Sequence, residues 1–168
     1  MITVKKHGIL LKTTGLEFEN EGVLNPATIR DGDIIHLFYR AVRKGNYSTI
    51  GYCKLSGPLT VVERSDKPIL SSFLDCESHG LEDPRIVKID NKYYMTYIVY
   101  DGNDALGALA TSDDLQTFER QGIMVPEIPY AKFLELIKSN PKIKESYANN
   151  YDPVQCFKRI NTKARVYL

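Results

Sequence analysis

The chain has 168 residues, of which 43% are hydrophobic and 26% charged, and its formal net charge is +1. This composition is typical of a soluble globular domain and excludes a chain that is mainly disordered. A net charge so close to zero gives no electrostatic reason to expect nucleic acid or an acidic membrane as a partner, so we expect a small or neutral ligand.

The N-terminal residues contain only a short apolar stretch, Ile9–Leu11, which Lys12 follows directly. This stretch is too short for a signal-peptide core or a membrane span, so we expect a cytoplasmic protein without membrane association. The cysteines are odd in number, widely separated and without the CxxC spacing of a zinc site. We therefore expect Cys53, Cys76 and Cys156 to be reduced and structural, and we expect no metal and no cofactor.

Two segments of the chain resemble each other in order and spacing. Pro26 lies over Pro84 at an offset of 58, and Gly51 lies over Gly107 at an offset of 56. In each copy a turn with Asp, Gly or Asn precedes a run of β-branched and aromatic residues, at 34–40 and 92–100. Repeats of roughly 40 to 60 residues with several short strands are typical of propeller blades, each of which needs neighbours to bury its faces. An ordinary sandwich with a chance similarity is the alternative.

We therefore predict an all-β fold in which residues 1–168 form the N-terminal part of a single β-propeller domain. The blade-like repeats lie at about 22–64 and 80–121, and a third repeat starts at about 153–168. Two blades and a fraction cannot close a ring, and an open ring exposes a blade face and a strand edge. We expect a fragment, a truncated gene product or a chain that depends on a partner for closure.

A helical insertion is predicted between the second and third repeats, at about 127–141. Pro141 stops the helix, and its apolar residues fall on one helical face: Tyr130, Phe133, Leu134 and Ile137. The helix would lie over the propeller rim, cover a substrate channel or mediate contacts in a homo-oligomer, and the sequence leaves these three roles open.

Asn25 and Asp83 occupy equivalent positions in the two repeats, each directly before a proline. The innermost strand of every propeller blade lines the central channel, so we expect these two side chains to share one pocket. Arg40 lies within a strand, where a charge is costly unless it serves a partner or a ligand. We expect its guanidinium to meet a sugar hydroxyl, a phosphate or the Asp83 carboxylate; exposure at the strand end is the alternative.

Glu82 and Asp83 are adjacent, and neighbours in an extended chain point to opposite sides, so only one of them should serve the pocket. They should not form the carboxylate pair of a retaining glycosidase. A water-poor pocket would favour proton donation by this carboxyl, whereas a nearby Arg85 would favour its ionised form. Catalysis by Asp83 and a structural salt bridge to Arg40 or Arg85 both stay open. His79 is a further residue that could line the site.

Four stretches of the chain resemble glycoside hydrolase family 130, the mannoside phosphorylases and related mannosidases, and the similarity covers residues 8 to 125. They are Gly22–Ala27, Leu37–Val42, Ser48–Tyr52 and Gly80–Ile86. The resemblance implies a five-bladed propeller with an axial pocket. It also implies cleavage of β-linked mannosides, of the mannooligosaccharide or mannosyl-glucose type, with inversion and with inorganic phosphate or water as the attacking group.

The resemblance further implies roles for individual residues. Asp83 matches the aspartate that donates the departing proton, apparently relayed through a mannosyl hydroxyl. Phosphate is itself a nucleophilic anion, so the enzyme needs cations that hold it in line rather than a second carboxylate. Arg159 is the candidate phosphate-binding residue. The candidate substrate-binding residues are Asn25, Arg40, Arg43, Arg85 and Asp101.

Two other hypotheses stay open. A furanosidase-type five-bladed propeller would combine Asn25 or Asp83 with further channel carboxylates in metal-independent hydrolysis. An inactive fragment would bind an oligosaccharide without cleaving it. Sugar 1-phosphate formed only with phosphate supports the mannoside enzyme, whereas release of arabinose or fructose favours the furanosidase.

Overall fold

The computed structural model describes residues 3–103, 105–124 and 135. Residues 1–121 belong to one compact unit and residues 122–168 to a second, of which only four residues are described. The helix predicted at about 127–141, apart from Glu135, and the repeat predicted at about 153–168, with Arg159, lie outside the described residues. Within the described part, no helix has the length and apolar content needed to cross a bilayer.

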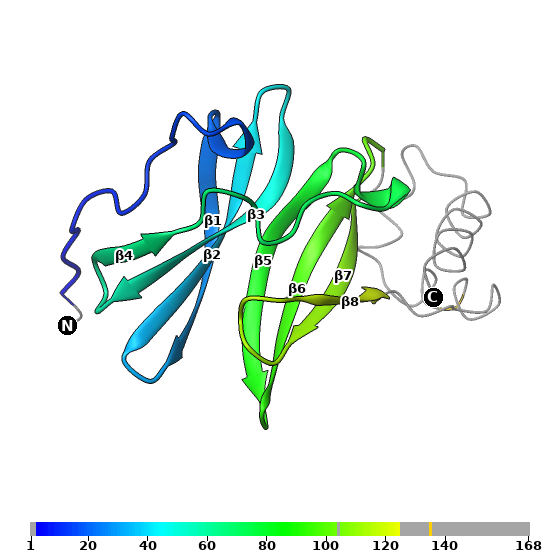
Figure 1. The fold of residues 1–168 in the computed structure, drawn as a ribbon. Helices are drawn as coiled ribbons and strands as arrows, with labels where there is room; N and C mark the ends of the chain where they lie inside the picture. The colour runs from blue at the N-terminus through cyan, green and yellow to red at the C-terminus, as the bar shows by residue number, and fades with distance from the viewer. Residues whose placement is uncertain (1–2, 104, 125–134, 136–168) are drawn as a thin grey trace. The chain divides into compact units, whose positions relative to one another are not determined.

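The described residues form eight strands and two single-turn 3-10 helices (Figure 1). The first four strands form an antiparallel meander, here called the first meander: β1 Gly22–Asp31, β2 Ile34–Arg43, β3 Tyr47–Ser56 and β4 Thr60–Arg64. The next four follow the same order and form the second meander: β5 Gly80–Ile89, β6 Lys92–Tyr100, β7 Ala105–Ser112 and β8 Glu119–Ile123. The 3-10 helix η1 (Glu17–Glu19) precedes β1, and η2 (Asp75–Glu77) precedes β5.

Two-residue turns join the first two strands of each meander. Gly32 has a φ of +58° in the turn between β1 and β2, and Asp90 has a φ of +52° in the turn between β5 and β6. Tight hairpin turns that match the strand twist need positive φ, which Gly, Asn and Asp tolerate best. The Asp-Gly-Asp and Asp-Asn sequences therefore form the turns that were predicted from them.

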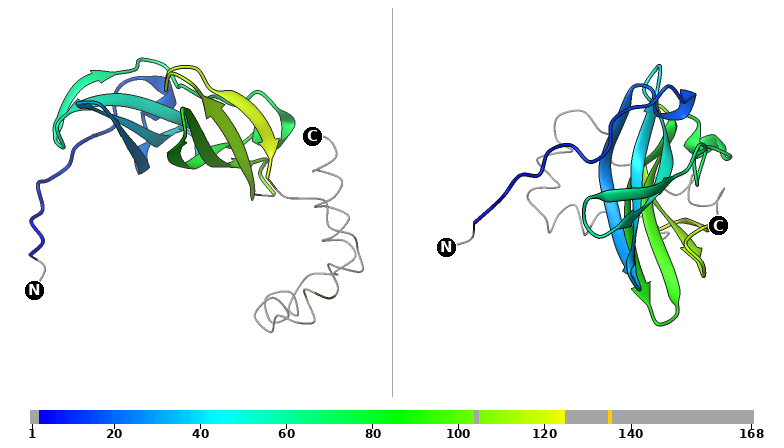
Figure 2. Two further views of the ribbon diagram at one scale, coloured as in Figure 1. Left: turned by 90° about the horizontal axis from the view of Figure 1, so that it is seen from below. Right: turned by 60° about the vertical axis from the view of Figure 1, so that its left-hand side comes forward.

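The two meanders share very little backbone pairing. Strand order in the sheet is β1-β2-β3-β5-β6-β7-β8, with β4 paired to β3, and the β3–β5 step is a single parallel bridge between Ser48 and Gly80. Figures 1 and 2 show two twisted groups of strands, blue to cyan and green to yellow, beside each other. The prediction of an all-β fold is confirmed. The sheet is open, and a five-bladed ring stays a prediction.

Side chains, rather than backbone, connect the meanders. Phe38 in β2 is fully buried and its ring meets Phe118, before β8, edge-on with centroids 5.5 Å apart. Tyr52 in β3 packs on Phe38, and its hydroxyl accepts a hydrogen bond of 2.7 Å from the Gln116 side chain. Apolar and polar contacts thus hold one face of the first meander against the β7–β8 connection of the second.

A buried carboxylate anchors the entrance of each meander. Glu19 in η1 is fully buried and accepts hydrogen bonds from the Tyr39 hydroxyl at 2.7 Å and from Arg64 Nη2 at 2.8 Å. Burial, followed by this hydrogen bond to Glu19, raises the pKa of Tyr39. These contacts tie the turn before β1 to the second and fourth strands of the same meander.

The second meander repeats this anchor. Glu77 in η2 is 1% exposed and accepts a hydrogen bond of 2.9 Å from Arg120 Nε in β8 and one of 2.8 Å from the backbone N–H of Phe73. Tyr97 in β6 lies close by: burial, and next the charge of Glu77, raise its pKa to about 12. Because Glu77 stands three residues before β5, the anchor fixes how the chain enters this strand.

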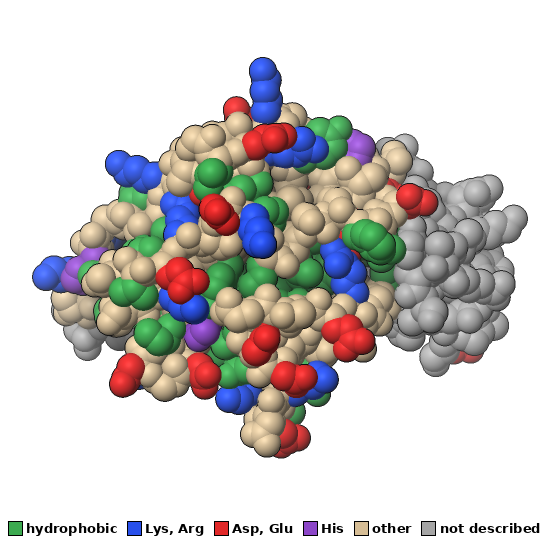
Figure 3. Space-filling view, viewed as in Figure 1, with side chains coloured by type: hydrophobic (Ala, Val, Ile, Leu, Met, Phe, Trp, Pro, Cys, Tyr) green, Lys and Arg blue, Asp and Glu red, His purple; other side chains and the backbone are tan. Residues whose placement is uncertain are grey.

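Charged side chains are dispersed over the surface. Lys, Arg, Asp and Glu alternate over the visible face rather than gathering by sign (Figure 3). Surfaces that bind nucleic acid usually carry a basic patch or stripe, and no such gathering is visible on this face.

Candidate active site at the paired bulges

The first strand of each meander is interrupted by a β-bulge at its Asx-Pro pair, Asn25-Pro26 in β1 and Asp83-Pro84 in β5. The pairing register with the next strand shifts at both places. Asn25 has a φ of +48° and Asp83 a φ of +51°. Asn and Asp are the residues other than glycine that best tolerate this left-handed conformation, and a proline cannot donate to a ladder, so it suits a bulge. The sequence therefore places the same irregularity in both strands.

The bulges bring Asn25 and Asp83 into direct contact. Asn25 Nδ2 donates a hydrogen bond of 2.5 Å to Asp83 Oδ1, although the two residues are 58 positions apart in the chain. β1 and β5 lie next to each other in the compact unit, so equivalent positions of the two strands can meet. The predicted convergence of these two side chains is thus found in the structure.

Arg40 joins this pair from the middle strand of the first meander. Its Nη2 lies 2.6 Å from Glu82 Oε1, and its Nη1 lies 3.9 Å from Asp83 Oδ1. Its Nε donates a hydrogen bond of 2.8 Å to Ser48 Oγ. The Arg40 side chain is only 15% exposed, so the alternative that it ends in solvent is wrong.

The expectation that Glu82 and Asp83 point to opposite sides is also wrong. Both carboxylates approach the same guanidinium, that of Arg40. The reason is the bulge: Asp83 with its positive φ is not extended backbone, so the alternation of side chains along β5 fails at this residue. The sequence did contain a sign of this bulge, because an Asn or Asp directly before a proline occurs at the same position in both repeats.

The two carboxylates differ in availability. The Glu82 side chain is 19% exposed and makes the short contact with Arg40, whereas the Asp83 side chain is 38% exposed and lies farther from that guanidinium. A ligand can therefore reach Asp83 more easily than Glu82. The arrangement offers one accessible carboxyl, one amide and one oriented guanidinium, which together can bind hydroxyl groups and move a proton.

The other predicted substrate-binding residues are not all part of this cluster. Arg43 binds Glu17 at 3.2 Å and lies over the Tyr47 ring, so it contributes to a different surface. Arg85 is exposed and donates to the Pro84 carbonyl at 2.7 Å; of the two arginines expected to pair with Asp83, Arg40 is the one within ion-pair distance.

Asp101 and His79 lie near the start of β5. Asp101 follows Tyr100, which pairs with Gly80, and its carboxylate accepts a hydrogen bond from the backbone N–H of Asn103 at 2.9 Å. His79 stacks on Tyr47 with ring centroids 5.2 Å apart. A role in substrate binding stays a prediction for Asp101.

Ser48 is a member of the cluster that sequence reasoning missed. It lies on β3, diagonally across from Arg40, which pairs with Ile50. Diagonal neighbours on paired strands are within reach of long side chains, and that spacing is the signal that could have found it.

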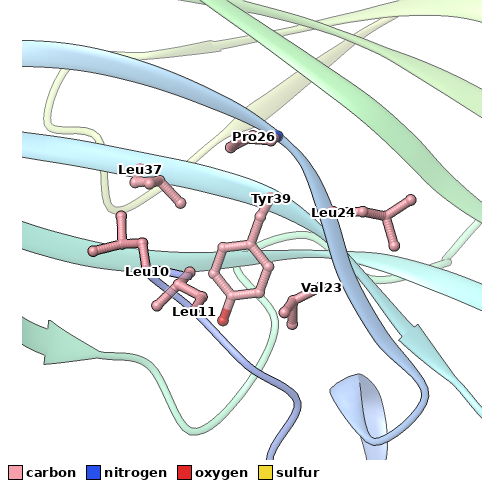
Figure 4. A pocket seen from close by; sticks show the side chains of 7 residues that line it. All are labelled: Leu10, Leu11, Val23, Leu24, Pro26, Leu37 and Tyr39. Carbon is pink, nitrogen blue, oxygen red and sulfur yellow. The ribbon is translucent and has the colours of Figure 1, made fainter. Parts of the chain in front are cut away.

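An apolar pocket lies beside the cluster and differs from it in chemistry. It has a volume of about 160 Å³. The polar side-chain atom in its lining is the Tyr39 hydroxyl, which already binds Glu19 and Arg64. A sugar would find few partners there. Its lining residues are Leu10, Leu11, Val23, Leu24, Pro26, Leu37 and Tyr39 (Figure 4).

Metal ligation has no visible basis in the part of the chain that the structure describes. No group of three or more His, Cys, Asp or Glu side chains there could hold a metal ion.

Comparison with protein families decides the class of this chain. The sequence model of glycoside hydrolase family 130, described as β-1,4-mannooligosaccharide phosphorylase, matches residues 12–164. The chain belongs to glycoside hydrolase family 130. The resemblance carried by the four sequence stretches is thereby confirmed. Membership of family 130 relates the chain to glycoside phosphorylases and glycosidases.

Curated members of the family support this assignment. A β-1,2-mannobiose phosphorylase from Thermoanaerobacter sp. (strain X514) is 39% identical over 66% of this chain and 42% of its own length. A 1,2-β-oligomannan phosphorylase from the same strain is 38% identical over 71% of this chain and 43% of its own length. The family 130 chain thus spans less than half the length of these two relatives.

Solved structures show the same kind of fold. A glycosyl hydrolase from Bacteroides ovatus superposes with a TM-score of 0.59, at 28% identity, over 63% of this chain and 33% of that one. A sucrose-6-phosphate hydrolase from Lactobacillus gasseri superposes with a TM-score of 0.58 at 17% identity, over 66% of this chain and 23% of that one. The second likeness concerns the fold alone, since the identity is so low.

Proposed function

We propose that this family 130 chain supplies the proton-donating half of an active site that cleaves β-linked mannosides with inorganic phosphate. The observation that carries the proposal is the contact between Asn25 and Asp83, with Arg40 alongside, at two bulges 58 residues apart. Both curated relatives are named as phosphorylases, which favours phosphate over water as the attacking group.

In this mechanism Asp83 is the catalytic acid. Its proton passes, directly or through a mannosyl hydroxyl, to the oxygen of the departing sugar, while phosphate attacks the anomeric carbon from the opposite face with inversion. The oxygen leaves with the proton as a sugar hydroxyl, and the mannosyl unit becomes mannose 1-phosphate. Phosphate needs no general base, so one accessible carboxyl is enough.

Asn25 and Arg40 position the mannosyl unit. The Asn25 amide orients the Asp83 carboxyl by its hydrogen bond, and Ser48 and Glu82 hold the Arg40 guanidinium in one direction. Fixed donors around a reacting bond contribute to catalysis because they need no reorganisation during the reaction. We assign Arg85 and Asp101 to the rim of this site, and we assign phosphate contact to Arg159, which stands outside the described residues.

The linkage proposed for the substrate follows the two curated relatives. Both names specify β-1,2-linked mannosides, whereas the description of the family specifies β-1,4 linkages. Because these two relatives are 38–39% identical to this chain in the aligned region, we propose β-1,2-mannobiose as the preferred substrate.

The test compares β-1,2-mannobiose and β-1,4-mannobiose as substrates of the chain, with and without inorganic phosphate. Phosphorus NMR follows mannose 1-phosphate, and free mannose is measured separately. Mannose 1-phosphate formed only with phosphate, and faster from the β-1,2 substrate, is the expected result. Free mannose without phosphate would show hydrolysis instead.

Sugar binding gives a readout that does not need turnover. Titration of β-1,2-mannobiose is expected to shift the NMR signals of the Asn25 side-chain amide, because this amide touches Asp83. The proposal would be overturned if no product formed and the Asn25 signals did not shift.

A further inference from the structure

Glu82 lies directly before the proposed acid and meets the same guanidinium. Its Oε1 lies 2.6 Å from Arg40 Nη2, whereas Asp83 Oδ1 lies 3.9 Å from Arg40 Nη1. The side chains of Arg40 and Glu82 are both largely buried, so water and salt screen their charges only in part. The proposed reaction gives the charge of Glu82 no chemical role.

A guanidinium beside a general acid creates a conflict. A nearby cation favours the ionised form of a carboxyl, and an ionised carboxyl has no proton to donate. The site nevertheless uses Arg40, because its N–H groups are donors for the hydroxyls of the mannosyl unit. A partner that compensates the charge of Arg40 without occupying Asp83 resolves this conflict.

Glu82 has the position that such a partner needs. Electrostatic attraction falls with distance, so the guanidinium of Arg40 interacts more strongly with Glu82 than with Asp83. The carboxylate of Glu82 also disfavours a second negative charge on the adjacent residue. The bulge makes this arrangement possible, because it breaks the alternation of side chains and brings both carboxylates to one guanidinium.

The contacts of Asp83 indicate which of its oxygens carries the proton. The neutral amide of Asn25 on β1 donates its hydrogen bond to Oδ1, and Oδ1 is also the oxygen that lies 3.9 Å from Arg40 Nη1. An oxygen that faces donors acts as an acceptor and needs no proton of its own. Oδ2 is therefore the oxygen that holds the proton and gives it to the substrate.

Two further charged side chains lie near the cluster, and solvent screens both. Arg85 on β5 is exposed and donates to the Pro84 carbonyl at 2.7 Å. Glu21, directly before β1, is exposed and lines a pocket together with Arg40. Exposed charges interact weakly because water and salt screen them. The part-buried Glu82 is therefore the group that compensates Arg40.

We propose that Glu82 is a positioning residue that keeps Asp83 a proton donor. Its carboxylate holds the Arg40 guanidinium and compensates its charge, so that Oδ2 of Asp83 retains its proton until the substrate takes it. This role rests on the proposed function, in which Asp83 is the catalytic acid. It depends on the charge of Glu82 and not only on its capacity to accept a hydrogen bond.

The test compares pH–rate profiles of β-1,2-mannobiose phosphorolysis between pH 5 and 8.5, at one phosphate concentration. Glu82→Gln removes the charge but keeps the size and an oxygen that can accept from Arg40. Glu82→Asp keeps the charge on a shorter side chain. Glu63→Gln is the matched control, because Glu63 pairs with Lys54 at 2.8 Å on the outer strands of the first meander. Urea titrations check that each variant is folded.

We expect Glu82→Gln to lower the rate roughly 10-fold at pH 7.5, because the uncompensated cation favours the ionised acid. The rate should return toward that of the parent chain at pH 5, where protons are more plentiful. Glu82→Asp should keep the shape of the parent profile, and Glu63→Gln should match the parent throughout. A Glu82→Gln rate that is lowered equally at every pH, or not lowered at all, would overturn this role.

The side-chain amide of Asn25 gives a second readout that needs neither sugar nor phosphate. It donates to Asp83 Oδ1, so its NMR signals change when that carboxyl loses its proton. We expect this change at lower pH in Glu82→Gln than in the parent and in Glu63→Gln. A change at the same pH in all three would overturn the role of Glu82 while the proposed function stands. A change at lower pH in a chain that neither binds nor cleaves β-1,2-mannobiose would support the effect of Glu82 on Asp83 and overturn the proposed function.

Discussion

The two meanders share a scaffold but differ in the groups that they present. Glu19 in the first and Glu77 in the second are both buried and both bind an arginine of the fourth strand, Arg64 or Arg120. Both meanders also enter their first strand three residues after this carboxylate and bulge at the same place. The parts that set backbone geometry are thus repeated.

The chemistry is divided between the meanders rather than repeated. The first bulge carries the amide of Asn25 and the second the carboxylate of Asp83. Arg40 has Ile98 at the equivalent position of the second repeat, so only the first meander supplies the guanidinium. Two similar backbones can therefore form a site with a single acid and its positioning groups. This is possible because the two meanders carry different side chains at equivalent positions.

Removing the arginine from each buried-carboxylate anchor is the strongest test of whether the two meanders have equivalent scaffolds. Arg64→Met and Arg120→Met each leave a buried carboxylate without its cation, a change that typically costs roughly 3–5 kcal/mol. We expect both to lower the free energy of unfolding by similar amounts in urea titrations. Arg30→Met is the control, since its ion pair with Asp33 is exposed and is worth little. A large loss of stability in only one of these two variants would contradict the view that the two anchors are equivalent.

The bulge residues test the division of chemistry. Asp83→Asn should lower phosphorolysis of β-1,2-mannobiose by about 100-fold or more, the usual contribution of a general acid, with little change in sugar binding. Asp113→Asn, at an exposed aspartate, should leave the rate unchanged. Turnover by Asp83→Asn at the parent rate would remove Asp83 from the mechanism. Binding of the sugar by the parent chain without any turnover would favour the inactive binding module.

A smaller effect is expected from a histidine that only the first meander contains. His36 is 8% exposed, and burial lowers its pKa below the ordinary value of 6.5; the equivalent residue of the second repeat is Tyr94. The folded state then binds this proton less readily than the unfolded state, so stability falls as the pH drops below 6.5. We expect His36→Gln to flatten this part of the stability profile in urea titrations at pH 5 to 7. An unchanged slope in the variant would show that His36 does not cause it.

Sequence reasoning located the strands and the meeting of Asn25 with Asp83 because both follow from periodicity. The repeat offset puts equivalent residues on equivalent strands, and the neighbouring first strands of the two meanders bring them together. The facing direction of Glu82 was missed because a bulge breaks the alternation on which the prediction rested. The anchors were missed because Glu19 lies in an acidic segment, Glu17 to Glu21, that reads as solvent-exposed.

The position of Arg43 could not be predicted for a different reason. Arg40 and Arg43 both lie on β2, but the last residue of a strand contacts whatever lies near the hairpin end, here Tyr47 at the start of β3 and Glu17 in η1. Such contacts do not follow from the repeat or from strand periodicity, so the sequence does not predict them.

A lone backbone bridge, between Ser48 and Gly80, joins ladders that are otherwise complete. Gly80 has a φ of +148°, and a Cβ there would come within 2.7 Å of the Ser48 backbone nitrogen, so the crossing point tolerates only glycine. Genes that encode such units can lengthen by copying one unit whole, since little backbone pairing beyond this bridge crosses the seam between the described meanders. Evolution could thus revise the catalytic equipment of one unit while its sister preserved the inherited architecture.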